Sequence, residues 1–257
     1  MIRVEYVNKK FRKLQALNNI LADFWKGQVV SLIGPNGSGK TTLIKTILGM
    51  VKPDSGKIYF NGEIINGDPS YRKNIGYMPQ IGRYPDNMKV GQLFEMLKSI
   101  RAVDEKDIDK DLVVKFNLED IYDKSMRTLS GGTRQKVSAA LAFLFDPDVL
   151  ILDEPTAGLD PLSSEILKEK IIKEKNKHKL ILISSHILSD LDDLTTHVMY
   201  LQEGKVEFFK DLSVLQNETG EIKLGRAIAR IMKDQKANAL WIDDVISKTE
   251  RRLSEQK

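Results

Sequence analysis

The feature that most constrains this chain is a glycine-rich stretch at residues 34–41. Its sequence, Gly-Pro-Asn-Gly-Ser-Gly-Lys-Thr, fits the pattern G-x-x-x-x-G-K-[S/T]. The apolar run 29–33 precedes it and a helix-forming sequence follows at 40–48, so the stretch occupies a strand-to-helix turn. At such a turn, backbone N–H groups and the helix N-terminus point into the loop and attract phosphate oxygens. The sequence therefore predicts a nucleotide-phosphate site on a strand–loop–helix unit.

The residues expected to bind the nucleotide lie in and directly after this loop. Lys40 is expected to reach the terminal phosphates, which also gives it a part in catalysis, and the Thr41 hydroxyl is expected to ligate Mg²⁺. A glycine-rich turn with an exposed lysine is the competing interpretation, and the complete match in this context disfavours it. The nucleotide-binding set is Gly34, Pro35, Asn36, Gly37, Ser38, Gly39, Lys40, Thr41 and Thr42.

Two adjacent acids follow another apolar strand pattern. Residues 149–152 are all apolar, and Asp153 and Glu154 come directly after them. Ligands bind at the carboxyl ends of strands in open α/β sheets, so both acids are expected at the phosphate site. Asp153 is the expected Mg²⁺ partner, and Glu154 is the expected general base for an attacking water. Adjacent acids are often a solvated surface pair, but the strand before them argues against that interpretation here.

The rest of the chain alternates between strand and helix patterns. Residues 2–6 alternate as a half-buried strand does, and Asn61-Gly62 marks a tight hairpin turn between 57–60 and 63–65. From about 89 to 145, apolar residues recur every three or four positions, which predicts an inserted helical subdomain. This α/β alternation predicts a parallel sheet covered by helices. Further strands are expected at 149–152, 180–184 and 198–201, and further helices at 162–175 and 187–194.

Residues 210–257 are expected to form a small helical tail rather than a second catalytic domain. Short helices are predicted at 224–233 and 239–253. Their apolar positions would bury a modest face. Those positions are Ile228, Ile231, Met232, Trp241, Ile242 and Val245.

Composition excludes several classes of function. The 257 residues contain no cysteine, which rules out disulfides, thiolate metal sites and cysteine nucleophiles. A formal net charge of +4 is small for this length, so no direct nucleic-acid partner is expected. The longest apolar runs are far shorter than the roughly 20 residues of a membrane-crossing helix, so the chain is not expected to span a membrane by itself.

A short stretch narrows the class of phosphate-binding protein. Residues 129–133, Leu-Ser-Gly-Gly-Thr, stand directly before a predicted helix and resemble the signature motif of ABC ATPases, with Thr133 in place of the more usual glutamine. Gln80 follows the strand pattern at 75–78 and is similar to that family's Q-loop glutamine. Asp160, in Ala-Gly-Leu-Asp, and His186, after the strand at 180–184, resemble its D-loop and switch histidine. The motifs occur in the family's order.

The resemblance covers residues 1–209 and implies a fold. That fold is a P-loop ATPase core with a mixed or parallel sheet, an N-terminal antiparallel β subdomain and an inserted helical subdomain at about 89–145. The resemblance also implies hydrolysis of ATP, with Mg²⁺ as cofactor, in a head-to-tail homodimer. Each ATP would lie between one chain's phosphate loop and the partner's signature motif. The signature residues acting in trans would be Ser130, Gly131, Gly132 and Thr133.

The same resemblance implies individual roles. His186 is expected to contact the γ-phosphate and orient the water, and Gln80 is expected to sense Mg²⁺ and water. Phe11 falls where the family places an aromatic ring that stacks on adenine; a place in the core is the alternative. His178 and His197 match no motif and are expected to be structural or solvated. The expected catalytic set is Glu154, His186, Gln80 and Lys40, and the expected metal set is Thr41, Gln80 and Asp153.

A single cassette without a coiled-coil insertion resembles a transporter subunit whose membrane-spanning permease is a separate polypeptide. Such a subunit would be cytoplasmic and peripheral at the inner face of the cell membrane. The stretch 80–84, with exposed Arg83 and Tyr84, is expected to form a groove for a short helix of the permease. The sequence looks like the bacterial export group and somewhat like the ATPase of copper and nitrous-oxide-reductase maturation, which leaves a copper or sulfur species, a drug or a polysaccharide as substrate. The alternative is a soluble non-transport ABC ATPase of regulation, translation or DNA maintenance.

Overall fold

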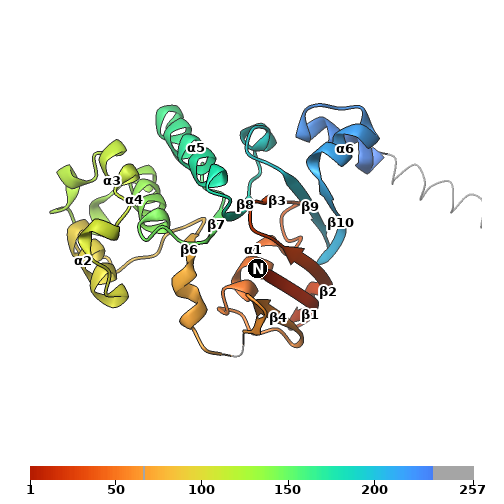
Figure 1. Ribbon diagram of the computed structural model, residues 1–257, viewed down its shortest axis with the longest axis horizontal. Helices are drawn as coiled ribbons and strands as arrows, with labels where there is room; N and C mark the ends of the chain where they lie inside the picture. The colour runs from red at the N-terminus through yellow and green to blue at the C-terminus, as the bar shows by residue number, and fades with distance from the viewer. Residues whose placement is uncertain (66, 234–257) are drawn as a thin grey trace, which may run out of the picture.

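The computed structural model describes residues 1–65 and 67–233 (Figure 1). Within these residues a six-stranded sheet has the order β10-β9-β3-β8-β7-β6, and a four-stranded antiparallel sheet has the order β2-β1-β4-β5. The strands are β1 (Ile2–Phe11), β2 (Leu14–Phe24), β3 (Val29–Ile33), β4 (Ser55–Phe60), β5 (Glu63–Ile64), β6 (Ile75–Met78), β7 (Val149–Asp153), β8 (Leu180–Ser184), β9 (His197–Gln202) and β10 (Lys205–Asp211).

Helices and short 3₁₀ turns connect the strands of the two sheets. The labelled α-helices are α1 (Lys40–Ile47), α2 (Val90–Arg101), α3 (Asp111–Lys115), α4 (Gly131–Phe143), α5 (Pro161–Asn176) and α6 (Leu212–Thr219). Short 3₁₀ turns are η1 (Ser70–Asn74), η2 (Glu105–Asp107), η3 (Glu119–Ile121), η4 (Met126–Thr128) and η5 (Leu188–Leu191). In Figure 1, α2, α3 and α4 gather at the left, away from β1, β2 and β4 of the antiparallel sheet.

The central strands are apolar and fully buried. β3, β7 and β8 are buried at every residue, as expected for parallel strands covered on both faces. Successive side chains alternate between the faces. Val30 and Leu32 belong to a core shared with α1 and the antiparallel sheet, whereas Val29 and Ile33 belong to a core shared with α4 and α5. The sheet therefore separates α1 from α4.

The predicted fold class is confirmed. The central sheet is mixed, because β10 pairs antiparallel with β9 while β9, β3, β8, β7 and β6 are parallel. The N-terminal sheet is antiparallel, and the helices α2, α3 and α4 are inserted between β6 and β7. The predicted hairpin turn is also present, since Asn61 and Gly62 both have positive φ (52° and 89°), as a type I′ turn requires.

The prediction of a helix at 187–194 is wrong. Only η5 forms there, a single 3₁₀ turn. The polar side chains that follow it bond to other parts of the chain. The Asp192 carboxylate accepts from the Leu224 N–H at 3.0 Å, and the Thr196 hydroxyl bonds to the backbone of Val29. Such side-chain bonds compete with the continuation of a helix.

The tail begins as part of the core. β10 runs through residue 209 to Asp211, and α6 follows it directly, so the division of the chain at 209/210 stays a prediction. Residues 224–233 are helical as predicted, and Ile228 is buried while Ile231 and Met232 pack against the core. The predicted helix at 239–253, with Trp241, Ile242 and Val245, lies outside the described residues.

In the part of the chain that is described, no helix has the length and apolar character to cross a membrane.

A buried ion network joins the helical insertion to the core. The Lys170 side chain on α5 is 4% exposed and its ammonium lies 3.0 Å from Glu174, whose side chain is 1% exposed. Lys170 also donates to Asp109, just before α3, and Lys179 lies 2.6 Å from Glu174. Burial alone would raise the pKa of Glu174, but the bonds from Lys179 and Lys170 outweigh it and lower that pKa. The stabilisation that Glu174 contributes is therefore fully present above the ordinary glutamate pKa. It is lost as the pH falls through the lowered pKa of Glu174 in the folded protein.

We expect Lys170→Met to lower the free energy of unfolding by about 3 kcal/mol, because it leaves the buried carboxylate of Glu174 with fewer partners. Lys173→Met is the control on the same helix: Lys173 is 54% exposed in its pair with Asp111, so its loss should cost less than about 1 kcal/mol. Chemical denaturation measures both. Equal losses for the two variants would contradict the assignment of this network as a buried anchor.

Candidate active site

The phosphate loop lies between β3 and α1 and is held in a shape that requires glycine. Gly34 and Gly39 have φ of 150° and 107°. A Cβ at Gly34 would lie 2.0 Å from the Leu201 carbonyl oxygen, and one at Gly39 would lie 2.5 Å from the Ala16 carbonyl oxygen. The loop therefore rests directly on the backbone of β9 and β2, which fixes it as a cradle.

Two side chains of the cradle are prepared for an anion. The Ser38 hydroxyl is buried, and among the residues that the structure describes its oxygen has no hydrogen-bond partner. The Lys40 ammonium folds back and donates to the carbonyl oxygens of Gly34 at 2.7 Å and Pro35 at 3.1 Å. Burial lowers the pKa of Lys40, an effect that the nearby Glu154 and Asp153 oppose. The Ser38 hydroxyl and the Lys40 ammonium could both donate hydrogen bonds to phosphate oxygens, so these residues fit a nucleotide.

A hydroxyl and a carboxylate face each other beside the cradle. The Thr41 hydroxyl, on the first turn of α1, donates to Asp153 at 3.3 Å, and Asp153 is buried at the end of β7. Hydroxyl and carboxylate oxygens are ligands that Mg²⁺ prefers. Tyr77, on the neighbouring β6, is kept as a neutral phenol because burial and the charge of Asp153 raise its pKa to about 12.

Glu154 is contacted from two neighbouring strands. Gln80 donates to one of its carboxylate oxygens at 3.1 Å, and His186 Nε2 lies 2.6 Å from the other. These three residues follow the ends of β6, β7 and β8, which are adjacent and parallel. The sheet therefore brings together residues far apart in sequence. A carboxylate held by an amide and an imidazole can accept a proton from a bound water. Gln80, predicted as a metal ligand, bonds here to Glu154.

Ser184 is a residue of the candidate site that the motif analysis missed. Its hydroxyl donates to Asp153, and it accepts from the Glu154 N–H at 3.1 Å, while its carbonyl oxygen accepts from the same N–H at 3.0 Å. These bonds support the left-handed conformation of Glu154, which has φ of 53°. The signal in the sequence was a hydroxyl at the end of an otherwise apolar strand, at a fully buried position.

The signature residues lie at the start of α4. Ser130 caps the helix and accepts from the Thr133 N–H at 3.2 Å. Gly132 lies against the loop after β7, since a Cβ there would be 2.7 Å from the Gly158 carbonyl oxygen. Asp160 caps α5 and pairs at 2.9 Å with Lys136 on α4, a partner that the motif analysis missed. Lys136 and the Ser163 bonds hold the pKa of Asp160 well below its usual range.

The structure decides one point about Phe11 and one about the stretch at 80–84. Phe11 is 45% exposed at the end of β1, with the Lys9 ammonium 5.3 Å from its ring centroid, so the alternative of a core residue is wrong. Tyr84 was expected to be exposed but is half-buried, because it packs against the core, and burial raises its pKa. Stacking of Phe11 on adenine stays a prediction.

A groove nevertheless lies at this stretch, beside α4. It encloses about 410 Å³. Ile81, which is 70% exposed, and Arg83 border it. The full lining is Ile81, Gly82, Arg83, Tyr84, Asp86, Met126 and Arg134.

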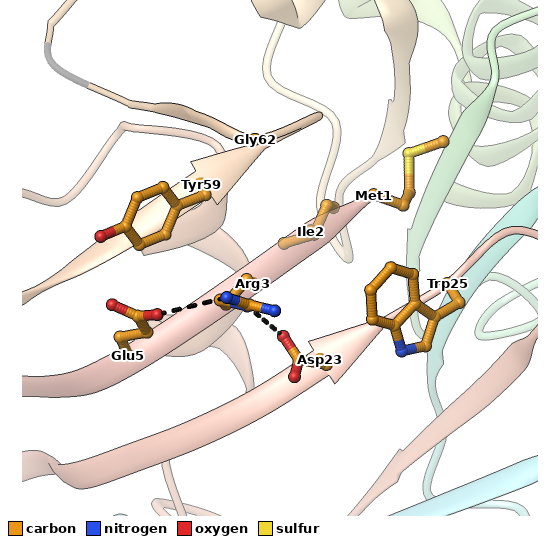
Figure 2. A pocket seen from close by; sticks show the side chains of 8 residues that line it. All are labelled: Met1, Ile2, Arg3, Glu5, Asp23, Trp25, Tyr59 and Gly62. Atoms are coloured by element: carbon orange, nitrogen blue, oxygen red, sulfur yellow. Dashed lines mark hydrogen bonds and ion pairs between the residues drawn. The ribbon is translucent and has the colours of Figure 1, made fainter.

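A second hollow, of about 320 Å³, lies on the antiparallel sheet (Figure 2). Arg3 crosses its wall and is paired with Asp23 at 2.9 Å and Glu5 at 3.6 Å, and the Trp25 ring stands at its edge (Figure 2). Asp23 raises the pKa of Arg3, so this charge is already neutralised by its neighbours. The lining comes from the N-terminus and from β1, β2, β4 and the turn after it, and includes none of the predicted site residues.

A glycine-rich loop lies at a strand-to-helix turn and faces a buried aspartate. This arrangement defines a P-loop nucleotide-binding protein. Residues 17–157 match the ABC transporter family. The chain is 35% identical over 227 residues to an uncharacterised ABC transporter ATP-binding protein of Bacillus subtilis, YhaQ, covering 87% of this chain and 73% of that protein. It is 34% identical over 229 residues to the lantibiotic transport ATP-binding protein SrtF of Streptococcus pyogenes, covering 84% and 93%.

A solved structure agrees with these relatives. The ATP-binding subunit of an ABC transporter superposes with a TM-score of 0.82 at 27% identity, covering 91% of this chain and 98% of that one. The chain belongs to the ABC transporter family, as an ATP-binding protein of that family, and it is an ATPase. The roles of its individual site residues stay predictions.

We expect Ser184→Ala to lower kcat for ATP about tenfold, because Asp153 and the Glu154 N–H lose the hydroxyl that fixes both. The free energy of unfolding should also fall, by about 1–2 kcal/mol, as a buried hydrogen bond is lost. Ser31→Ala is the matched control. Ser31 is equally buried, on β3, and bonds to Thr195 at 2.6 Å, so its loss should lower stability similarly and spare kcat. Equal kcat losses in both variants would contradict a specific role for Ser184.

Proposed function

We propose that the chain powers a membrane transporter by hydrolysing Mg-ATP in a head-to-tail dimer, and that a separate permease carries the substrate. The observation that carries this proposal is the separation of two halves of one site. The phosphate loop opens α1, which packs on one face of the central sheet, whereas the signature residues open α4, which packs on the other. This separation supports a site to which one chain contributes its phosphate loop and a second copy contributes its signature residues.

Each residue group has a distinct task in this proposal. The cradle binds the phosphates through its backbone N–H groups, Ser38 and Lys40. Thr41 and Asp153 would hold Mg²⁺, which neutralises phosphate charge when bound. Glu154 accepts the proton of the attacking water, and Gln80 and His186 orient that water and the carboxylate. The 3.1 Å and 2.6 Å contacts of Gln80 and His186 with Glu154 support these assignments.

The permease contact is assigned to the groove at 81–86. Ile81 offers an exposed apolar side chain and Arg83 an exposed cation there, and Met126 and Arg134 extend the same lining to the beginning of α4. A short helix of the permease would thus touch both the segment after Gln80 and the signature helix. This contact would place the protein peripherally at the cytoplasmic face of the membrane. The substrate classes named from the sequence stay predictions.

The shared site predicts complementation between two inactive variants. Lys40→Ala removes a chain's own phosphate contact, and Ser130→Arg places bulk and charge where the partner's γ-phosphate would dock. Each homodimer should have less than about 1% of wild-type turnover, since both of its sites are damaged. In an equal mixture, a heterodimer has one site with both defects and one with neither. ATP hydrolysis by the mixture should therefore rise well above that of either variant alone.

Glu154→Gln provides the control for dimer formation. The amide keeps the shape of the side chain and loses the base, so Mg-ATP should be retained and the closed dimer should accumulate in size-exclusion chromatography. Two results together would refute the shared site. The mixture would recover no activity, and Glu154→Gln ATPase subunits in Mg-ATP would not pair with each other, either alone or in the complex with the permease.

The groove assignment is tested with single cysteines, because the chain contains none of its own. Ile81→Cys should crosslink to the permease in the reconstituted transporter. Ile222→Cys is the control: Ile222 is even more exposed, at 86%, but lies in the tail segment before residue 224, so it should not crosslink. Crosslinking from position 222 with none from position 81 would place the permease on another face.

A further inference from the structure

Two segments behind the candidate active site are tied together by a carboxylate that no motif includes. One is the loop after β7, in which Thr156 follows Glu154 by two residues. The other is η5, in which Asp190 follows His186 by four residues. The Thr156 hydroxyl donates to one Asp190 oxygen at 2.9 Å, and the Lys168 ammonium on α5 lies 2.8 Å from the other. Both oxygens of Asp190 are therefore used.

This tie closes a ring of contacts around Glu154 and His186. At the base of the ring, Ser184 bonds to the Glu154 N–H at the strand ends. At the far side, Asp190 bonds to Thr156. The 2.6 Å contact between Glu154 and His186 lies between these two links.

The His186 segment needs such an anchor. The His186 side chain is 44% exposed, so packing restrains it little. The element that follows is one 3₁₀ turn, and such turns have weaker hydrogen-bond geometry than an α-helix. By contrast, the side chains of Lys168 and Asp190 are only 23% and 21% exposed, which shields their ion pair from solvent.

We propose that Asp190 is a positioning residue for ATP hydrolysis, which clasps the His186 segment to the loop behind Glu154. The proposal rests on the roles assigned above to Glu154 and His186. Its two oxygens are engaged by Thr156 and Lys168, so the role proposed for Asp190 is an indirect one. It sets the distance between the imidazole and the carboxylate, and displacements of about 1 Å in an active site can cost about 10²-fold in rate.

The same segment supplies a matched control. Asp192 lies two residues beyond Asp190 and accepts from the Leu224 N–H at 3.0 Å. It therefore ties the segment to the helical stretch 224–233 rather than to the Glu154 loop. Asp190 and Asp192 are the same residue type, both partly buried, with bonds to different parts of the core.

The test compares full-length variants in Mg-ATP hydrolysis, nucleotide binding and thermal unfolding. Asp190→Ala should lower kcat about tenfold and leave KM for ATP within about twofold, because the phosphate cradle is untouched. Asp190→Asn keeps an oxygen for Thr156 and should lose less than about threefold. Asp192→Ala should keep kcat within about twofold of wild type, whatever its effect on the midpoint of unfolding.

A double-mutant cycle separates positioning from general destabilisation. If Asp190 acts through His186, adding Asp190→Ala to His186→Ala should lower kcat no further. Wild-type kcat in Asp190→Ala, equal kcat losses at positions 190 and 192, or a full additional loss in the double variant would each overturn the clasp while leaving the proposed function intact. Wild-type kcat in His186→Ala would overturn the role assigned to His186, and the clasp with it.

Discussion

The candidate active site depends on the pairing of β7 with β8 and on the hydroxyl at the end of β8. The parallel register sets Asp153 opposite Ser184. From that position one hydroxyl donates to Asp153 and accepts from the Glu154 N–H, so a single side chain fixes both acids. Glu154 leaves the strand with φ of 53°, a conformation that a non-glycine residue adopts at some cost. The bonds from β8 offset that cost and turn the carboxylate toward Gln80 and His186.

The same sheet that assembles these residues keeps the helix after the phosphate loop and the helix after the signature residues on opposite faces. α1 packs in the core on one face, and α4 packs in the core on the other. α4 contacts the loop after β7, where Gly132 lies against Gly158 and Lys136 pairs with Asp160. The helix that borders the groove therefore contacts the segment that follows Glu154 directly. This arrangement suits a protein whose hydrolysis is coupled to a partner.

Much of the fold followed from local patterns. The apolar runs gave the buried strands, and Asn61-Gly62 gave the hairpin turn, because both depend on residues close together in sequence. The pattern at 187–194 gave a wrong prediction, since its apolar residues recur at the three- and four-residue spacing of a helix. In the structure Asp192 and Thr196 bond to Leu224 and Val29, partners that no local pattern reveals. Tyr84 was misjudged for the same reason, because the core residues against which it packs come from elements distant in the sequence.

By itself the sequence determined the phosphate cradle, since the pattern G-x-x-x-x-G-K-[S/T] between an apolar run and a helix-forming sequence is a local signal. It also determined the strand that ends in Asp153 and Glu154, because four apolar residues followed by two acids form a local signal. Only the tertiary structure decided which side chains hold those acids. Ser184, Lys136 and Asp190 carry no motif of their own, and each acquires its role from a strand or helix brought beside it by packing. The reason is physical: a hydrogen bond depends on position in space, whereas a motif records only spacing along the chain.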